Sequence, residues 1–329
     1  MLKKAVFWVR SISLGVIVLL LAACSAEKTN VVSTTFHNTT AYFNAYFIAN
    51  EHIVEIEKAI YESRDDNYNK ILNILIDIDT NFTNSLSEKI EDVIVKASLP
   101  IQRHQNSKWV DDSYLLIGKA RLYSGDYANA VETFKYVNTH SQDKDARHLA
   151  LINLMRTFIE HDEFNNAIAV FDYLKKEKIN DDNKKQLFLV TAYLYQLSED
   201  YQNMILYLNA AIDLSKKSDH LARKYFIAGQ VYQKFGYDSA AYSNYQKCLR
   251  NNPEYELSFH SRLNMAQVVH VAKSKNVKKV RRNFNKLLKD KKNEEYKDKI
   301  YYEMARFELK ENNHDKAVSL LRNSVANSQ

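Results

Sequence analysis

Apolar residues recur along most of this chain at the three- and four-residue spacing of amphipathic helices. Residues 111–142 show the pattern most clearly. One apolar stripe ends at Tyr123, a second begins at Tyr127, and Gly125 and Asp126 stand between them. The pattern predicts two short helices joined by a tight turn.

This two-helix unit recurs with a period of 37 residues. Its second helix carries a repeated residue, mostly small, at Ala130, Ala167, Met204 and Ala241. Twelve residues earlier stand Gly118, Met155, Ala192 and Gly229, and four residues later stand Phe134, Phe171, Leu208 and Tyr245. A degenerate fifth unit has Val280 and Phe284 at the second-helix positions, and a sixth has Ala305, Ala317 and Leu321.

This layout is typical of a tetratricopeptide (TPR) repeat. Such a repeat has a small residue in its first helix, a tight turn, and then a small and a bulky residue four positions apart in its second helix. About six copies predict an all-α, TPR-type right-handed solenoid of helix-turn-helix repeats over residues 109–329. The alternative, an unrelated helical bundle, would not keep this register six times.

Composition supports a helical chain, because it holds only five Gly and two Pro in 329 residues. Residues 36–108 are therefore expected to form an N-terminal helical region. A polar break at residues 64–69 and an apolar run at residues 71–78 interrupt it. No repeat register is evident there.

The N-terminal residues predict that the protein is exported from the cytoplasm. Three cations in the first ten residues precede a short apolar run that closes with Leu-Ala-Ala-Cys at Cys24. This ending resembles a bacterial lipobox, so we predict a signal peptide over residues 1–23, acylation of Cys24 and a lipidated tether over residues 24–35. Ser25 favours an outer-membrane, lipid-anchored, periplasm-facing location. The alternative is a plain signal peptide or anchor helix with an incidental cysteine.

The remaining cysteine, Cys248, falls at a small-residue position of a repeat helix and is expected to be a packed core thiol. With Cys24 acylated, no disulfide within the chain is possible.

Candidate catalytic chemistry is sparse. Phosphate loops, paired-cysteine metal motifs and nucleophile elbows are missing, so we predict a non-enzymatic protein without a small-molecule substrate. No cofactor is expected beyond the acyl lipid. Asp77, Asp79, Asn81 and Glu88 match four positions of a calcium loop, but Phe82 replaces the required Gly, which favours a helix end. His140 and His148 are expected to be solvated.

A dense basic run spans residues 273–292. Because an exported lipoprotein rarely meets nucleic acid, we expect a solvated helix face rather than nucleic-acid binding. An acidic protein partner or anionic lipid is the alternative.

In a TPR stack, the first helix of each repeat lines a groove. Equivalent groove positions in this register are Lys119, Arg156, Tyr193, Gln230 and Arg306. Cations with hydrogen-bonding side chains between them suit an acidic or extended peptide. The alternative is that exposed positions are simply polar.

Three segments carry a family resemblance: residues 36–47 (FHNTTAYFNAYF), 101–104 (IQRH) and 108–121 (KWVDDSYLLIGKAR). In this order they resemble the SprE/PorW lipoproteins of Bacteroidota. The resemblance implies a periplasm-facing outer-membrane lipoprotein that supports type IX secretion and gliding motility, with secretion-machine proteins as partners. The resemblance departs at the far end, because members of that family typically continue well past this length, and a short form would lack part of their function of linking outer-membrane and periplasmic parts of the machine.

Two other lipidated TPR modules stay open as alternatives. One is an assembly factor for outer-membrane barrels. The other is a nutrient-capture lipoprotein, although the large insertions with aromatic platforms typical of that class are not visible here.

Overall fold

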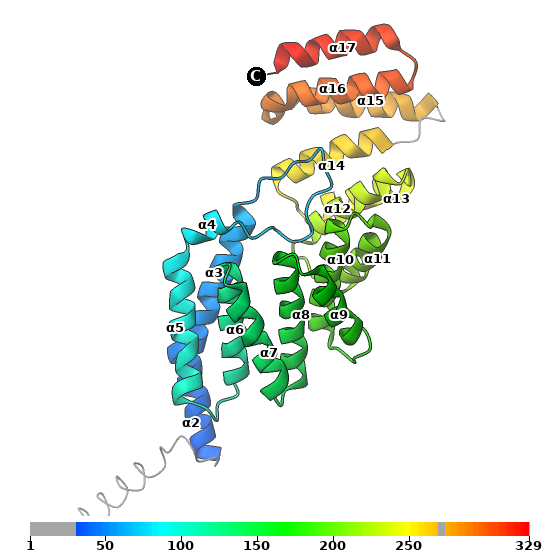
Figure 1. Ribbon diagram of the computed structural model, residues 1–329. Helices are drawn as coiled ribbons and strands as arrows, with labels where there is room; N and C mark the ends of the chain where they lie inside the picture. Colours follow the sequence, from blue (N-terminus) through cyan, green and yellow to red (C-terminus); the bar gives the residue numbers. More distant parts are fainter. Residues whose placement is uncertain (1–30, 269–273, 329) are drawn as a thin grey trace, which may run out of the picture. The chain divides into compact units, whose positions relative to one another are not determined.

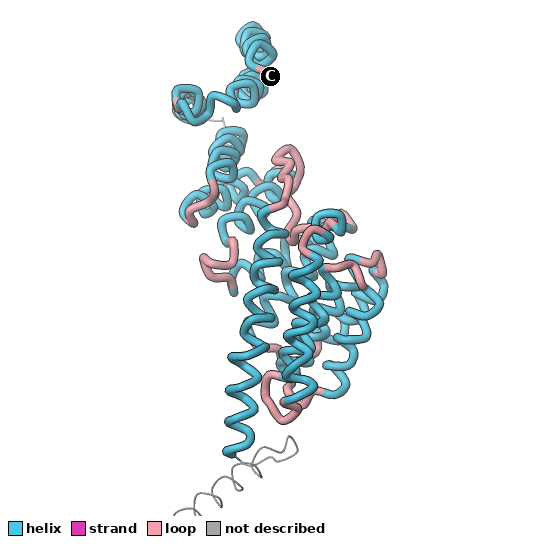
Figure 2. The backbone as a smooth tube through the Cα atoms, turned by 90° about the vertical axis from the view of Figure 1, so that its left-hand side faces the viewer, coloured by secondary structure: helices cyan, strands magenta, loops and turns pink. Residues whose placement is uncertain are grey.

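The computed structural model of the protein describes residues 31–268 and 274–328, and every regular element in these ranges is a helix (Figures 1 and 2). The N-terminal elements are α2 (Val31–Ala41), the π-helical turn η1 (Tyr42–Tyr46), α3 (Phe47–Glu62), α4 (Thr80–Asn84) and α5 (Ser87–Arg103). The first repeats form α6 (Val110–Tyr123), α7 (Tyr127–His140), α8 (Lys144–Glu160), α9 (Phe164–Leu174), α10 (Asp181–Leu197) and α11 (Tyr201–Leu214). The later repeats form α12 (Leu221–Lys234), α13 (Asp238–Arg250), α14 (Tyr255–Val268), α15 (Ser274–Lys289), the 3₁₀ turn η2 (Lys291–Tyr296), α16 (Lys297–Lys310) and α17 (His314–Asn327). The predicted all-α class of paired helices is confirmed.

The chain divides into two compact units. Of the described residues, unit 1 contains 31–65 and 75–190, and unit 2 contains 66–74, 191–268 and 274–328. In unit 1, α5 packs on α3 and α6, and each helix from α6 to α8 packs on the next. In unit 2, each helix from α11 to α16 packs on the next. Residues 66–74 are thus a non-helical segment that belongs to unit 2, although they lie far from its other residues in the sequence.

The turns inside the five repeats whose turn residues the structure describes share one backbone conformation. The first residue of the turn is left-handed at Gly125 (φ 76°), Asp162 (φ 59°), Glu199 (φ 56°), Gly236 (φ 75°) and Asn312 (φ 61°). The next amide closes a six-to-one hydrogen bond to the preceding helix, as Asp126 N–H does to Arg121 O at 2.9 Å. Asp126 and Asp200 then cap the second helix by accepting from the N–H groups of Asn129 and Asn203. The turn residues of each such repeat therefore end the first helix with a C-cap and begin the second helix with an N-cap directly afterwards.

Replacing Asp162 with glycine is expected to raise the free energy of unfolding by about 0.5–1 kcal/mol, because only glycine adopts a left-handed conformation without steric cost. Gly125→Ala is the matched opposite change and should lower it by about 1 kcal/mol. Urea unfolding measures both variants. If both substitutions raise the free energy of unfolding, or both lower it, the explanation is contradicted.

Glycine also permits close helix contact within two repeats. A Cβ atom on Gly118 would lie 2.4 Å from the Phe134 ring, and one on Gly229 would lie 2.6 Å from the Tyr245 ring. Both rings are fully buried. The small residue and the bulky residue of the repeat signature are therefore one direct contact across the hairpin.

We expect Gly229→Ala to lower the stability of unit 2 by about 1–3 kcal/mol, since the buried Tyr245 ring must move to admit a methyl group. Ser243→Ala, at an exposed position of α13, should change the stability little. Thermal melting of both proteins makes the comparison. A loss of the same size in the two variants would point to helix effects instead of packing.

The three segments that carry the family resemblance meet in unit 1. Nδ1 of His37 lies 2.8 Å from Nδ1 of His104, and the Asn38 side chain accepts from the Lys108 N–H at 2.9 Å. The Trp109 ring lies against the rings of Tyr42 and Tyr46, with centroids 4.8 and 4.7 Å away. These residues therefore join α2, η1 and the end of α5 to the start of α6.

The fifth and sixth units agree with the predicted register. Val280, Phe284, Ala305 and Ala317 are all fully buried and belong to one apolar cluster with Phe259, Ile300 and Phe307. At the other end of the described chain, α2 begins at Val31, so it includes the last residues of the segment predicted as a tether. Cys24 and the predicted signal peptide lie outside the described residues. Among the described helices, none has the length and apolarity needed to cross a membrane.

Candidate peptide groove in unit 2

Unit 2 holds a piece of its own chain as if it were a bound peptide. Residues Asp66–Ile74, which we term the resident segment, contact side chains of α10, α12 and α14. Leu72 and Ile74 are buried there, with 3% and 8% of their surfaces exposed. We term the surface that receives the segment the resident groove.

Two glutamines hold the main chain of the resident segment. Gln230 accepts from the Leu72 N–H at 2.9 Å and donates to the Lys70 carbonyl at 2.7 Å. Gln196 accepts from the Ile74 N–H at 2.9 Å and donates to the Leu72 carbonyl at 3.0 Å. Each carboxamide therefore binds one carbonyl and the N–H two residues later, as a neighbouring β-strand would.

A side-chain amide has one donor edge and one acceptor, like a peptide group, so it can replace a strand partner. Such bonds read the main chain and not the side-chain sequence. Buried main-chain groups need partners, and in the resident groove the two glutamines supply them. The groove is thus chemically suited to extended peptides in general.

An ion pair and an aromatic stack fix the start of the segment. Arg223 donates from Nη1 and Nη2 to the two Asp66 carboxylate oxygens at 2.5 and 2.8 Å, and Nη2 also lies 3.2 Å from the Asn73 carbonyl. The Tyr68 ring stacks on His260, with centroids 3.9 Å apart and planes 7° apart. Arg223 is 5% exposed and His260 is 6% exposed, so both contacts are shielded from water.

Burial, together with the positive charge of Lys299, lowers the pKa of His260 to about 4. The histidine is therefore neutral at physiological pH and stacks as an uncharged ring.

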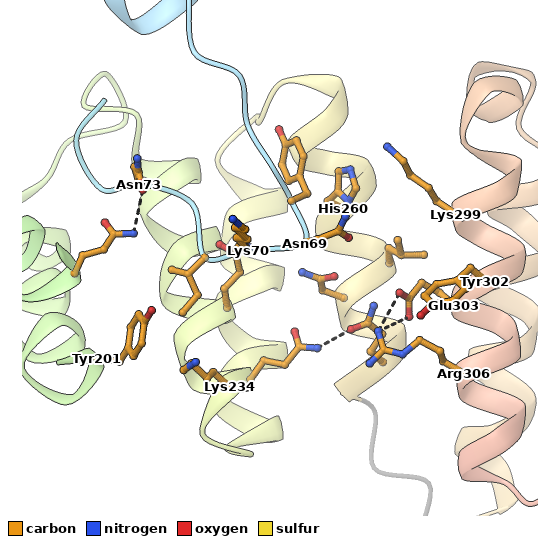
Figure 3. Close-up of a pocket in the computed structure, with 18 of the residues that line it drawn as sticks. Asn69, Lys70, Asn73, Tyr201, Lys234, His260, Lys299, Tyr302, Glu303 and Arg306 are labelled. Carbon is orange, nitrogen blue, oxygen red and sulfur yellow. Dashed lines mark hydrogen bonds and ion pairs between the residues drawn. The ribbon is translucent and has the colours of Figure 1, made fainter. Parts of the chain in front are cut away.

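An open cavity of about 1390 Å³ adjoins the resident segment, and all of its lining residues belong to unit 2 (Figure 3). Side chains of α12, α14 and α16 line it, and Asn69, Lys70 and Asn73 of the resident segment line it as well. In α16, Arg306 lies 3.1 Å from Glu303. Burial raises the pKa of the Glu303 carboxyl, while Arg306 beside it acts in the opposite direction.

The five predicted groove positions fall in both units. In unit 1, Lys119 lies 2.9 Å from the Glu57 carboxylate, and Arg156 pairs with Glu160 and donates to the Ile76 carbonyl at 2.8 Å. In unit 2, Tyr193 is 3% exposed, Gln230 holds the resident segment, and Arg306 lines the cavity. The structure thus brings Gln230 and Arg306 to one cavity.

Sequence reasoning missed Gln196, Arg223 and the resident segment itself. The signal was present in the register, because Gln196 and Gln233 are 37 residues apart, as are Gln230 and Gln267. Glutamine thus repeats at the period of the solenoid at both positions that bind the resident segment.

Other predicted residues have structural roles. Cys248 is fully buried, and burial raises the pKa of its thiol to about 11, which confirms a packed thiol. Asp79 caps α4 by accepting from the Asn81 N–H, which confirms the helix end. The prediction for His148 was wrong: it is 3% exposed and lies 3.6 Å from Glu177, because α8 packs on both neighbouring helices. No group of three or more metal-ligating side chains occurs within the described ranges.

In comparisons with known proteins, no family model matches the chain, and no curated protein matches it. A tetratricopeptide repeat protein from Parabacteroides merdae resembles it with a TM-score of 0.39 at 10% identity, over 85% of this chain and 94% of that one. A chain of the APC/C hetero-tetramer Cut9–Hcn1 gives a TM-score of 0.39 at 14% identity, over 76% of this chain and 48% of that one. Similarities this distant carry no functional argument.

Proposed function

We propose that the protein is a non-enzymatic TPR scaffold that holds extended segments of other proteins. The observation that supports this is the resident groove, in which Gln196 and Gln230 bind four main-chain groups of an extended segment. A surface that binds a main chain in this way gives affinity without requiring one side-chain sequence.

The site of action in this proposal is the periplasmic face of the outer membrane. The lipobox-like ending at Cys24 would supply the acyl anchor, and acyl chains hold a protein at a membrane through their buried methylenes. The three segments at residues 36–47, 101–104 and 108–121 favour a role in type IX protein secretion and gliding motility. The partners would then be secretion-machine proteins of the outer membrane and periplasm.

Affinity capture tests this proposal. The tagged chain is expressed in the bacterium that encodes it, membranes are solubilised in mild detergent, and captured proteins are identified by mass spectrometry. We expect secretion-machine components to co-purify with the wild-type chain. A Cys24→Ala chain should retain periplasmic partners while leaving the membrane fraction, since only its anchor is removed. Recovery of barrel-assembly proteins alone, or of no machine component, would count against the secretion role.

A further inference from the structure

The glutamines that hold the resident segment have equivalents one repeat further on. Gln233 stands 37 residues after Gln196, and Gln267 stands 37 residues after Gln230. All four side chains line the open cavity, but the first pair binds the resident segment, whereas Gln233 and Gln267 bond to each other. The same two register positions thus occur twice, and the first occurrence holds a main chain.

Gln233 and Gln267 bond to each other and to the unit around them. Nε2 of Gln233 donates to Oε1 of Gln267 at 2.6 Å, and Oε1 of Gln233 accepts from the buried Tyr245 hydroxyl at 2.6 Å. Gln267 also hydrogen-bonds to the Glu303 carboxyl. The bond between the two amides is neutral, so exchanging that bond for bonds to a peptide group costs little net free energy. Both amides therefore have partners within unit 2, and a bound main chain would replace the bond between them.

The cavity suits a peptide better than a small molecule. Its volume of about 1390 Å³ exceeds the roughly 300–1,000 Å³ of usual small-molecule sites. Its charges are mixed, since four cations, Lys70, Lys234, Lys299 and Arg306, stand with three acidic residues, Glu199, Asp298 and Glu303. An excess of one positive charge selects ligand charge only weakly, and recognition is left to main-chain bonds and to contacts with half-buried or exposed side chains such as Tyr302.

We propose that this cavity binds an extended peptide segment of a partner protein, beside the resident segment, through main-chain hydrogen bonds to Gln233 and Gln267. The inference deepens the proposed scaffold function and rests on it, because it names the class of ligand and the residues that read it. The resident segment then forms a fixed wall of the site, and the partner segment occupies the adjoining space.

A phage-displayed dodecapeptide library selected against the full chain tests this assignment. The peptides that enrich are synthesised with a fluorophore, and their affinities are measured by anisotropy. Gln267→Ala should weaken their binding about tenfold, the effect of one lost hydrogen bond of about 1.4 kcal/mol. Gln233→Glu should do the same, since it keeps an acceptor for the Tyr245 hydroxyl and removes the amide donor. Gln202→Ala, at an exposed position of α11, should leave binding unchanged.

A second arm tests main-chain reading directly. Single N-methyl substitutions within an enriched peptide remove one N–H each, and we expect at least one of them to weaken binding as strongly as Gln267→Ala does. Circular dichroism confirms that each protein variant is folded. If Gln233→Glu fails to fold, Gln267→Ala and the N-methyl series decide the result.

The inference is overturned if no peptide enriches, or if affinities are equal for wild type, Gln233→Glu and Gln267→Ala. It is also overturned if the chain forms a concentration-dependent dimer that Gln267→Ala abolishes, because the occupant is then a second copy. Peptide binding that depends on Gln267 would stand even if membrane capture recovered no secretion component, so the two proposals can fail separately.

Discussion

Replacing Arg223 with methionine is expected to lower the free energy of unfolding of unit 2 by about 3 kcal/mol, because the substitution leaves the Asp66 carboxylate without its partner in a shielded place. Both oxygens of that carboxylate accept from the Arg223 guanidinium, and the two side chains are only 6% and 12% exposed. The same substitution removes the donor to the Asn73 carbonyl. We therefore expect the resident segment to leave its groove more often.

Amide hydrogen exchange measures this effect best, since it reports each segment separately. Exchange at Leu72 and Ile74, whose amides are bound by Gln230 and Gln196, should accelerate in Arg223→Met. Urea unfolding measures the overall decrease in the free energy of unfolding.

A double variant separates the unpaired charge from lost packing. Arg223→Met combined with Asp66→Leu should recover a large part of the loss, because two apolar side chains replace a buried ion pair at little cost. Lys135→Met, which breaks an exposed ion pair with Glu132, should change stability by less than about 0.5 kcal/mol. If the double variant is as unstable as the single one, the uncompensated charge is not the cause.

The sequence predicted the repeats well because the repeat signature is local. The contact of Gly118 with Phe134 joins residues only sixteen apart, and the left-handed turn is marked by glycine at Gly125 and Gly236. Asp162, Glu199 and Asn312 adopt the same left-handed conformation without glycine. Their turns can still be located, because the repeat register gives the spacing between the turn and the small residue of the second helix. Short-range contacts of this kind determine both the spacing and the turn.

The resident segment escaped prediction because its partners are distant. The apolar run at residues 71–78 fits a buried helix as well as a buried strand by periodicity alone. What decides the outcome is the pair of carboxamides on Gln196 and Gln230, which stand more than 120 residues further along the chain. Gln230 is 8% exposed for the same reason, although a groove position is expected to be open to solvent. The local sequence does not determine which surface a segment will cover, because the residues of that surface are distant in the chain.

Acidification is expected to loosen the resident groove through His260. Its folded pKa is about 4 and its ordinary value is 6.5, so between these values the unfolded chain binds more protons than the folded one. The stability contributed by neutral His260 is therefore fully present above pH 6.5, falls as the pH drops, and is lost once the pH passes below about 4. A shift of this size corresponds to about 3 kcal/mol.

The variant His260→Phe isolates this effect, because phenylalanine keeps an aromatic ring against Tyr68 and does not titrate. We expect wild type to lose about 3 kcal/mol more than His260→Phe in urea unfolding between pH 7 and pH 4. Taking the difference between the two proteins removes the contributions of other carboxyls, such as that of Asp112, whose pKa burial and nearby carboxylates raise to about 6.

His140 supplies a matched control, because it also stacks on a tyrosine, Tyr136, but at an exposed position. His140→Phe is expected to change the free energy of unfolding by less than about 0.5 kcal/mol, because the position is exposed. Nuclear magnetic resonance of the His260 ring gives the pKa directly, with His260→Phe assigning the signal. A folded pKa at or above 6.5 would show that the stack does not exclude the proton, and the resident segment would then have to be held independently of pH.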